Sequence, residues 1–268
     1  MSPSPRSNRD GLSDGSQVFD RILCGVDGSN QAMQAARQAT RLAVGPVLFV
    51  ACVDVMTARR AGGALVGQLL EHVHAEAADA LSQAKAIAPD SITRNVSGRP
   101  ATMLLRMAGS EATTLLAIGS SGGSRAAGAV FGSVATAVLH EAPCPVLIAR
   151  PATSTDVFPR RVIVGVDGSA QSAEALAVGR ELGRRLDAEV QPLVSTGGRG
   201  RRPDVDLVRQ LAGDVKVDGA TPVTALCDAA SNADLVVLGS RGLRGLRALG
   251  SVSERVAHKA TSSVLMVR

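Results

Sequence analysis

The chain contains one set of motifs twice, and this repetition constrains its fold more than any other feature. The segment Arg21–Ser29 (RILCGVDGS) returns 140 positions later as Arg161–Ser169 (RVIVGVDGS). In the same way, Leu116–Gly122 (LAIGSSG) returns 120 positions later as Val236–Gly242 (VVLGSRG). A solenoid repeats every ~20–50 residues, so this longer period indicates two tandem copies of one domain.

The length of 268 residues agrees with that interpretation, because each copy then has the usual size of a domain. We expect a flexible tail over 1–18, a first domain over 19–150, a linker over 151–160 and a shortened second domain over 161–268. Hydrophobic residues make up 45% of the chain but aromatic residues only 1%. Both cores therefore have to be built from aliphatic side chains.

Composition argues against nucleic acids and membranes as partners. Base stacking needs aromatic side chains, which the chain almost lacks. The net charge of +5 is mild, and we interpret the cluster Arg199, Arg201 and Arg202 as a solvated loop. No apolar stretch approaches the ~20 residues of a membrane span. The polar residues 1–17 resemble neither a signal peptide nor an anchor.

Cysteine usage predicts a cytoplasmic protein. Four cysteines are widely spaced without a CxxC pair, which is typical of reduced thiols in the cytosol. The histidines form no ligand spacing with them, so we predict no metal site. These residues are Cys24, Cys52, Cys144 and Cys227, with His72, His74, His140 and His258.

Strand and helix patterns alternate through the first copy. This order predicts an open parallel sheet with helices on both faces and right-handed crossovers. The expected strands are Arg21–Val26, Pro46–Val55, Ser91–Val96, Thr114–Ile118 and Val146–Ala149. The expected helices are Ser29–Val44, Ala64–Ala88, Pro100–Gly109 and Ser133–Glu141.

The second copy keeps this order but is 20 residues shorter between the aspartate of its first motif and the glycine of its second. The loss falls between its second and third strands. There we expect a loop over Gly197–Pro203 and a short helix over Val205–Leu211 in place of the long helix. Pro192 interrupts the second strand, which predicts an edge position for that strand.

A glycine-rich loop carries the chemistry that the sequence predicts. It reads Gly119-x-x-Gly122, then nine residues, then Gly132-Ser133, and it runs from a strand end to a helix start. Glycines let backbone N–H groups approach a ligand, and a helix N-terminus favours phosphate. Asp27, at the end of the first strand, would face the same crevice. A simple turn without a ligand is the alternative interpretation. The loop matches neither a Walker A motif, nor a dinucleotide fingerprint, nor a hydrolase elbow.

Together these motifs resemble the universal stress protein family. The resemblance rests on Gly25–Ser29, on the loop from Gly119 to Val134, and on Ala142–Ile148, with partial matches in the second copy. It covers nearly the whole chain from Phe19. It implies a doubly wound sheet of the adenine nucleotide alpha hydrolase-like type with strand order 3-2-1-4-5 in each copy. It also implies ATP, with or without Mg, in the crevice of the nucleotide-binding members.

The resemblance assigns roles to individual residues of the first copy. Gly25 and Asp27 would flank adenosine, and Cys52 would lie against adenine, where the family usually has Val. Ribose and phosphates would be held by Gly119, Gly122, Gly132, Ser133 and the amide of Val134. Arg125 would either reach the phosphates or remain a solvated loop residue.

The second copy departs from the pattern. Seven residues separate Gly242 from Gly250, against nine at the equivalent place in the first copy. A shorter loop cannot follow the same path around a triphosphate. Arg241, Arg244 and Arg247 would either bind phosphate there or form a solvated basic face. The corresponding candidate residues are Gly165, Asp167, Gly239, Gly242, Gly250 and Ser251.

These observations leave three functions open. The first is an ATP-binding regulator or adaptor in the stress response, the second a slow ATPase, and the third a nucleotide-free scaffold. For His140 and His258, near the end of the last helix of each copy, we expect a capping or surface role and not that of a general base. The last strands, Val146–Ala149 and Val264–Val267, would pair the two copies with each other, and a homodimer of that unit is a further expectation.

Overall fold

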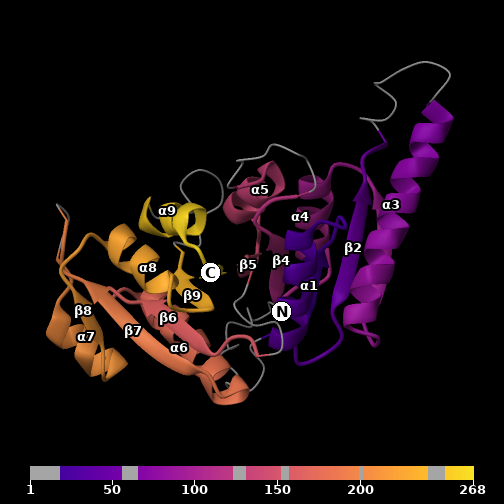
Figure 1. The fold of residues 1–268 in the computed structure, drawn as a ribbon. Helices are drawn as coiled ribbons and strands as arrows, with labels where there is room; N and C mark the ends of the chain where they lie inside the picture. Colours follow the sequence, from indigo (N-terminus) through magenta and orange to yellow (C-terminus); the bar gives the residue numbers. More distant parts are fainter. Residues whose placement is uncertain (1–18, 56–65, 123–130, 152–156, 199–201, 241–250) are drawn as a thin grey trace, which may run out of the picture.

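The computed structural model describes residues 19–55, 66–122, 131–151, 157–198, 202–240 and 251–268. The expected tail over 1–18 and half of the expected linker lie outside this part of the chain. Within it, one sheet runs in the order β3-β2-β1-β4-β5-β10-β9-β6-β7-β8 (Figure 1). The first half contains β1 (Ile22–Gly25), α1 (Asn30–Leu42), β2 (Leu48–Val53), α3 (Val66–Ile87), β3 (Ile92–Ser97), α4 (Pro100–Ser110), β4 (Leu115–Gly119), α5 (Ser133–Glu141) and β5 (Val146–Ala149). The second contains β6 (Arg161–Gly165), α6 (Ala170–Leu186), β7 (Glu189–Ser195), α7 (Val205–Ala212), β8 (Lys216–Asp218), α8 (Pro222–Ala230), β9 (Leu235–Gly239), α9 (Ser251–Lys259) and β10 (Ser263–Val267).

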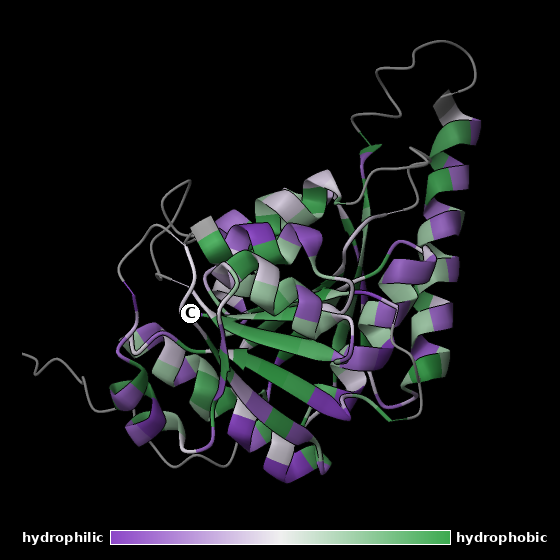
Figure 2. Ribbon diagram, turned by 60° about the vertical axis from the view of Figure 1, so that its left-hand side comes forward, coloured by the Kyte–Doolittle hydropathy of each residue, from purple (hydrophilic) through white to green (hydrophobic). Residues whose placement is uncertain are grey.

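Both halves have the predicted fold. Counted within each half, the strand order is 3-2-1-4-5, and all pairings inside a half are parallel. The central strands are continuous apolar runs because helices cover both of their faces. Two clusters of buried, mainly aliphatic side chains result, one on each side of the sheet, and the first also contains Phe19, Phe49 and Phe158. The hydropathy colouring shows the apolar strands between helices whose outer faces are polar (Figure 2).

The first helix of each half begins where the repeated motif predicts. The hydroxyl of Ser29 accepts a hydrogen bond from the backbone N–H of Ala32 at 3.2 Å, and Ser169 accepts one from Ser172 at the same distance. These serines are N-caps, which satisfy a free donor in the first turn. The alanines of α1 then pack closely on β4, because a small side chain allows the helix to approach the sheet.

The last strands of the two halves pair with each other. β5 and β10 are antiparallel, with Leu147 opposite Leu265. A single ten-stranded sheet results, and its outer edges are β3 and β8. Figure 1 shows the halves on either side of this junction.

Two arginines reinforce the junction reciprocally. Arg150 follows β5, is only 6% exposed, and donates from its guanidinium to the carbonyls of Ala257 and Ser262 in the second half. Arg268 follows β10 and donates to the carbonyl of Leu139 in α5 at 2.5 Å. Each arginine therefore places a positive charge at the carboxyl end of the other half's last helix, where the helix dipole favours it.

The prediction of an edge position for Pro192 is wrong. Its strand, β7, pairs with β6 on one side and β8 on the other. Glu189 and Leu193 direct their backbone groups toward β6, so the alternate residue Pro192 faces the other side. On that side the pairing with β8 begins only at Leu193. Pro192 therefore faces the side of β8 at a position just before β8 begins. No ladder hydrogen bond requires a backbone N–H there.

The two halves differ most in the helix before their third strand. α3 has 22 residues, whereas α7 has 8, as expected from the shortened second copy. The side chain of Asp204 caps α7 by accepting from the N–H groups of Asp206 and Leu207. Among the described residues, none of the helices has the length and apolar character needed to cross a membrane.

Candidate functional site

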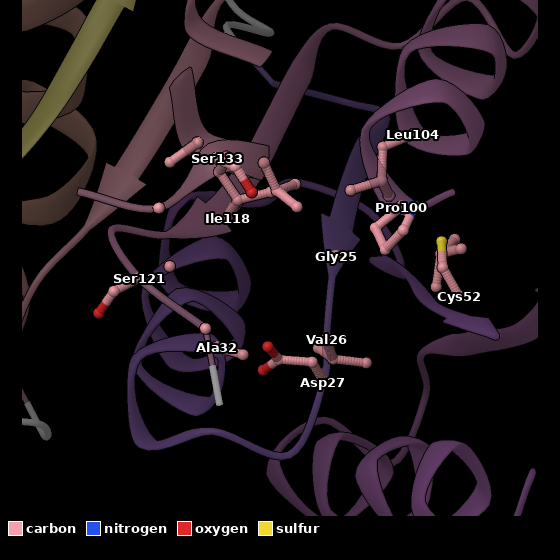
Figure 3. Close-up of a pocket in the computed structure, with 16 residues that line it drawn as sticks. Gly25, Val26, Asp27, Ala32, Cys52, Pro100, Leu104, Ile118, Ser121 and Ser133 are labelled. Atoms are coloured by element: carbon pink, nitrogen blue, oxygen red, sulfur yellow. The ribbon is translucent and has the colours of Figure 1, made fainter. Parts of the chain in front are cut away.

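A pocket lies at the carboxyl ends of β1 and β4, which are adjacent in the sheet. Its volume is about 230 Å³. Eight of the predicted site residues line the pocket (Figure 3). They come from four elements, β1, β2, β4 and α5, and from the loops that follow the strands. They are Gly25, Asp27, Cys52, Gly119, Gly122, Gly132, Ser133 and Val134. The crossovers of the fold thus bring together motifs that are more than 100 positions apart.

Eight further residues complete the wall and were missed by the sequence analysis. They are Val26, Ala32, Val50, Pro100, Leu104, Ile118, Ser121 and Ala135. Most are small or aliphatic, and the sequence shows such residues only as core material. Leu104 could have been found from its helix, because α4 begins with Pro100 at the edge of the same crevice.

Asp27 is held in a fixed orientation beside the pocket. Its Oδ1 accepts hydrogen bonds from the backbone N–H of Ser29 at 3.0 Å and from the Ser29 hydroxyl at 2.6 Å. Its Oδ2 lies on the side of Gly122, where it would be only 2.6 Å from a β-carbon at that position. The carboxylate therefore occupies the space that a side chain at Gly122 would need.

The glycines of the motif have two different reasons to lack a side chain. A β-carbon at Gly119 would lie 2.7 Å from the backbone of Gln31 in α1, and one at Gly25 would lie 2.8 Å from Leu104. These two glycines are required by packing. Gly122 and Gly132 instead border the opening, where Gly132 has only ordinary contacts with Ser121. The argument that glycine admits a ligand applies to this second pair.

The first turn of α5 faces the pocket with backbone N–H groups that have no partner within the helix. Gly132 is the N-cap residue and has no side chain to cap the helix. Its own N–H donates to the carbonyl of Ser120 at 2.8 Å, and its carbonyl accepts from the N–H of Thr136 at 2.9 Å. The amides of Ser133 and Val134 precede the first intrahelical donor, and both residues line the pocket. This is the geometry in which helix N-termini bind anions.

Cys52 forms part of the apolar wall. Its side chain is half-buried, and burial raises the pKa of the thiol to about 11. The thiol is therefore protonated at neutral pH and acts as a small apolar group. It has no nucleophilic role at that pH, because only the thiolate is reactive.

A wider groove of about 980 Å³ adjoins the pocket between α3, α4 and α5. The two spaces share the residues Val26, Asp27, Cys52, Pro100, Ser133 and Val134. The groove also contains negatively and positively charged side chains, including Glu76 of α3 and Arg99 just before α4. A ligand larger than the pocket can therefore extend into the groove. Among the described residues, no three His, Cys, Asp or Glu side chains gather in a metal-binding cluster.

The second half repeats the backbone of the site but changes its chemistry. Asp167 accepts from Ser169 in the same way as Asp27 accepts from Ser29. Burial raises the pKa of Asp167, but hydrogen bonds from Ser169 and Ser172 outweigh burial and lower it below its ordinary value. A β-carbon at Gly165 would clash with Leu238, and one at Gly239 would clash with the backbone of Gln171. Packing therefore explains both glycines.

Three small apolar positions of the first pocket are serines in the second half. Ser172, Ser195 and Ser253 stand where the first half has Ala32, Cys52 and Ala135. Their hydroxyls donate to the carbonyls of Ser169, Ala220 and Gly239. The remaining predicted residues Arg125, Gly242 and Gly250, and the side chain of Ser251, lie outside the described part of the chain, as do Arg241, Arg244 and Arg247.

The two histidines occupy equivalent positions of α5 and α9, and both belong to the junction between the halves. His140 is only 12% exposed, and its Nε2 lies 3.3 Å from a carboxylate oxygen of Glu254. The ring of His258 lies against that of Phe131, with 4.1 Å between the centroids. Both histidines lie in the last turn of their helices, as the capping interpretation requires, but a plain surface role is wrong for His140, whose side chain is enclosed at the junction.

Comparison with known proteins places this geometry in a family. The universal stress protein family model matches residues 19–150 and 209–268, which is well over half of the chain. A universal stress protein of Mycolicibacterium smegmatis is 27% identical over 285 residues and spans 92% of this chain and 96% of its own. One from Mycobacterium tuberculosis is 29% identical over 184 residues, which cover 56% of this chain. That match spans 60% of the relative's length.

Solved structures show the same fold. The crystal structure of a universal stress protein from Archaeoglobus fulgidus superposes with a TM-score of 0.71 and 20% identity, covering 94% of this chain and 97% of that one. The superposition spans both halves, so the ten-stranded arrangement as a whole resembles that protein. The motifs, the fold and the extent of the family match lead to one conclusion: the chain belongs to the universal stress protein family.

Proposed function

We propose that the first half binds ATP and that the protein acts as a nucleotide-dependent regulator or adaptor in the stress response. One observation carries the proposal: Asp27, Gly122 and the amino end of α5 surround a single pocket. The apolar wall that includes Leu104 and Ile118 suits a purine. The backbone amides that begin α5 suit phosphate oxygens.

The small volume of the pocket supports a nucleotide of which only part is enclosed by the protein. A pocket of about 230 Å³ lies below the ~300–1,000 Å³ typical of whole drug-sized ligands. Base and sugar would fill it, and the phosphates would extend past Ser133. None of the described lining residues is Lys or Arg. Backbone amides, and Mg carried by the nucleotide, would then balance the phosphate charge.

A regulator agrees better with the pocket than an ATPase. Asp27 is the one carboxylate among the described lining residues of the pocket. Its Oδ1 already accepts hydrogen bonds from Ser29. Activating a water molecule for hydrolysis requires a base or positioning group with free access to it. Slow hydrolysis would therefore depend on Oδ2 of Asp27, on a carboxylate of the adjoining groove such as Glu76, or on residues outside the described part of the chain.

Substitution of Gly122 tests the proposal. Calorimetric titration of the full chain with ATP, with and without Mg, should show one tight site, and Gly122→Val should lose at least tenfold in affinity. The reason is that a β-carbon there lies 2.6 Å from Oδ2 of Asp27. Gly109→Val is the matched control, because a β-carbon there meets no described atom within 4 Å beyond its chain neighbours and the backbone of its own helix. Absence of heat with the unsubstituted chain at millimolar ATP would refute the proposal.

We also propose a cytoplasmic location, supported by four free cysteines. A homodimer would have to use a surface other than the last strands, because β5 and β10 are paired within the chain. The outer edges β3 and β8 remain for such an assembly. Native mass spectrometry would report the number of chains and of bound nucleotides together.

A further inference from the structure

The second half contacts the residue that immediately precedes the anion-binding turn of the first. Phe131 stands directly before Gly132 and Ser133. Its ring centroid lies 4.1 Å from that of His258 in α9, and the two planes are inclined by 38°. The guanidinium carbon of Arg150 lies 6.0 Å from the same centroid, within the range of a cation–π contact.

The contact bears on the pocket because Gly132 has no side chain of its own to hold it. Backbone hydrogen bonds to Ser120 and Thr136 fix Gly132. The residue before Gly132 is Phe131, whose ring is half-buried. It packs against the core cluster that contains residues of both halves. The Phe131 ring is thus a second restraint on the turn that leads into α5, in addition to the backbone hydrogen bonds of Gly132.

We propose that His258 is a positioning residue for the pocket of the first half. Its ring holds Phe131, and Phe131 in turn holds the amides of Ser133 and Val134 where they meet an anionic ligand. The second half thereby completes the binding site of the first. This inference rests on the proposed function, since it assigns phosphate to the amino end of α5.

The repeat itself shows that this contact is specific. His140 occupies the position of α5 that His258 occupies in α9, yet it faces Glu254 and not a ring. The position equivalent to Glu254 in α5 is Thr136, whose hydroxyl donates to the carbonyl of Gly132 at 3.0 Å. Two equivalent histidines thus have different partners across the same junction. Of these two histidines, it is His258 that contacts Phe131, the residue beside the pocket.

Three variants test the proposal by calorimetric titration of the full chain with ATP. His258→Ala should weaken binding about two- to tenfold, the range expected for loss of an aromatic ring pair. His258→Phe should restore the affinity because it keeps a ring. The matched control His140→Ala also alters the junction but not the contact with Phe131, so its affinity should stay within twofold. If His258→Ala does not fold, His258→Leu replaces it, because Leu fills the space without a ring.

A second measurement follows the turn directly. The chain has no Trp, so Phe131→Trp introduces a single fluorophore at the contact. Its emission should change when ATP binds, and adding His258→Ala should lower its anisotropy even without ATP, because the indole loses its neighbour.

The outcomes separate the two proposals. If the unsubstituted chain binds no ATP, the proposed function fails, while the anisotropy still decides whether α9 holds the turn. Equal affinity of His258→Ala and the unsubstituted chain would overturn the positioning role alone. An equal loss in His140→Ala would also overturn it, because general loosening of the junction would then be the cause.

Discussion

At the scale of single residues, the glycines show why a motif has to be read with its neighbours in space. Gly25 and Gly119 match the pattern of a ligand-binding loop, but close packing against Leu104 and α1 already excludes a side chain. Gly122 is different, since the atom that excludes a side chain there belongs to Asp27. The sequence predicts only half of the residues that line the pocket, and it cannot separate glycines required by packing from glycines that give a ligand access.

Cys52 offers a prediction about occupancy of the pocket. A slow thiol reagent applied at about pH 9 should modify Cys52 and Cys227, which are partly exposed, before the buried Cys24 and Cys144. Burial raises the pKa of Cys52 to about 11, so its reaction should accelerate as the pH rises toward that value. ATP should protect Cys52 and leave Cys227 unprotected, as peptide mass mapping would show. Equal protection of both thiols would mean that the nucleotide does not bind in this pocket.

At the scale of elements, predictions from periodicity and capping were close to the structure. β5 has the predicted bounds, and α1, α4 and α7 end within two residues of the expectation. The errors fall at strand ends, where pairing with a neighbour decides the last residue. Pro192 is an error of another kind, about the place of β7 in the sheet: the sequence shows a residue without an N–H, but the length of β8 decides whether that N–H is missed.

The carboxyl end of α4 carries a feature that sequence did not predict. Ala112, two residues beyond the helix, has a φ of 48° in the left-handed region. That conformation costs an L-residue about 1–2 kcal/mol, and helices commonly use Gly there. Ala112→Gly should therefore raise the free energy of unfolding by about 1 kcal/mol in urea denaturation. A decrease would show that the alanine methyl makes a compensating contact.

At the scale of the whole molecule, the repeated last strand decides how the halves meet. Each half ends in a strand followed by an arginine, Arg150 or Arg268. Antiparallel pairing sends each arginine to the last helix of the other half, and burial lowers the pKa of Arg150 to about 10. Arg150 therefore remains charged at neutral pH. The junction is thus built from reciprocal caps, which either half alone would lack.

The junction should also give stability a dependence on pH. Burial lowers the pKa of His258 from its ordinary value near 6.5; Glu254 opposes that shift, whereas His140 and Arg150 add to it. The folded state therefore favours neutral His258, and the unfolded state takes up a proton first as the pH falls. Stability should decline from about pH 6.5 down to the pKa of the folded state.

Urea denaturation at about pH 8 and about pH 5 would check this dependence. The His258→Phe variant serves as the comparison, because it lacks this titration but keeps a ring and the other three histidines. The unsubstituted chain should lose more stability on acidification than the variant. Equal losses would place the pH dependence in other groups.

Resemblance to a known family supplied the strand order within each half. The sequence by itself determined the two-fold repeat and eight of the residues that line the first pocket. It could do so because strands, caps and glycine turns are local patterns, and parallel crossovers then bring their ends to one edge. Only the tertiary structure decided that packing explains Gly119, that α5 and α9 meet, and that His258 reaches Phe131. Those facts depend on distances between segments remote in the chain, which no local pattern records.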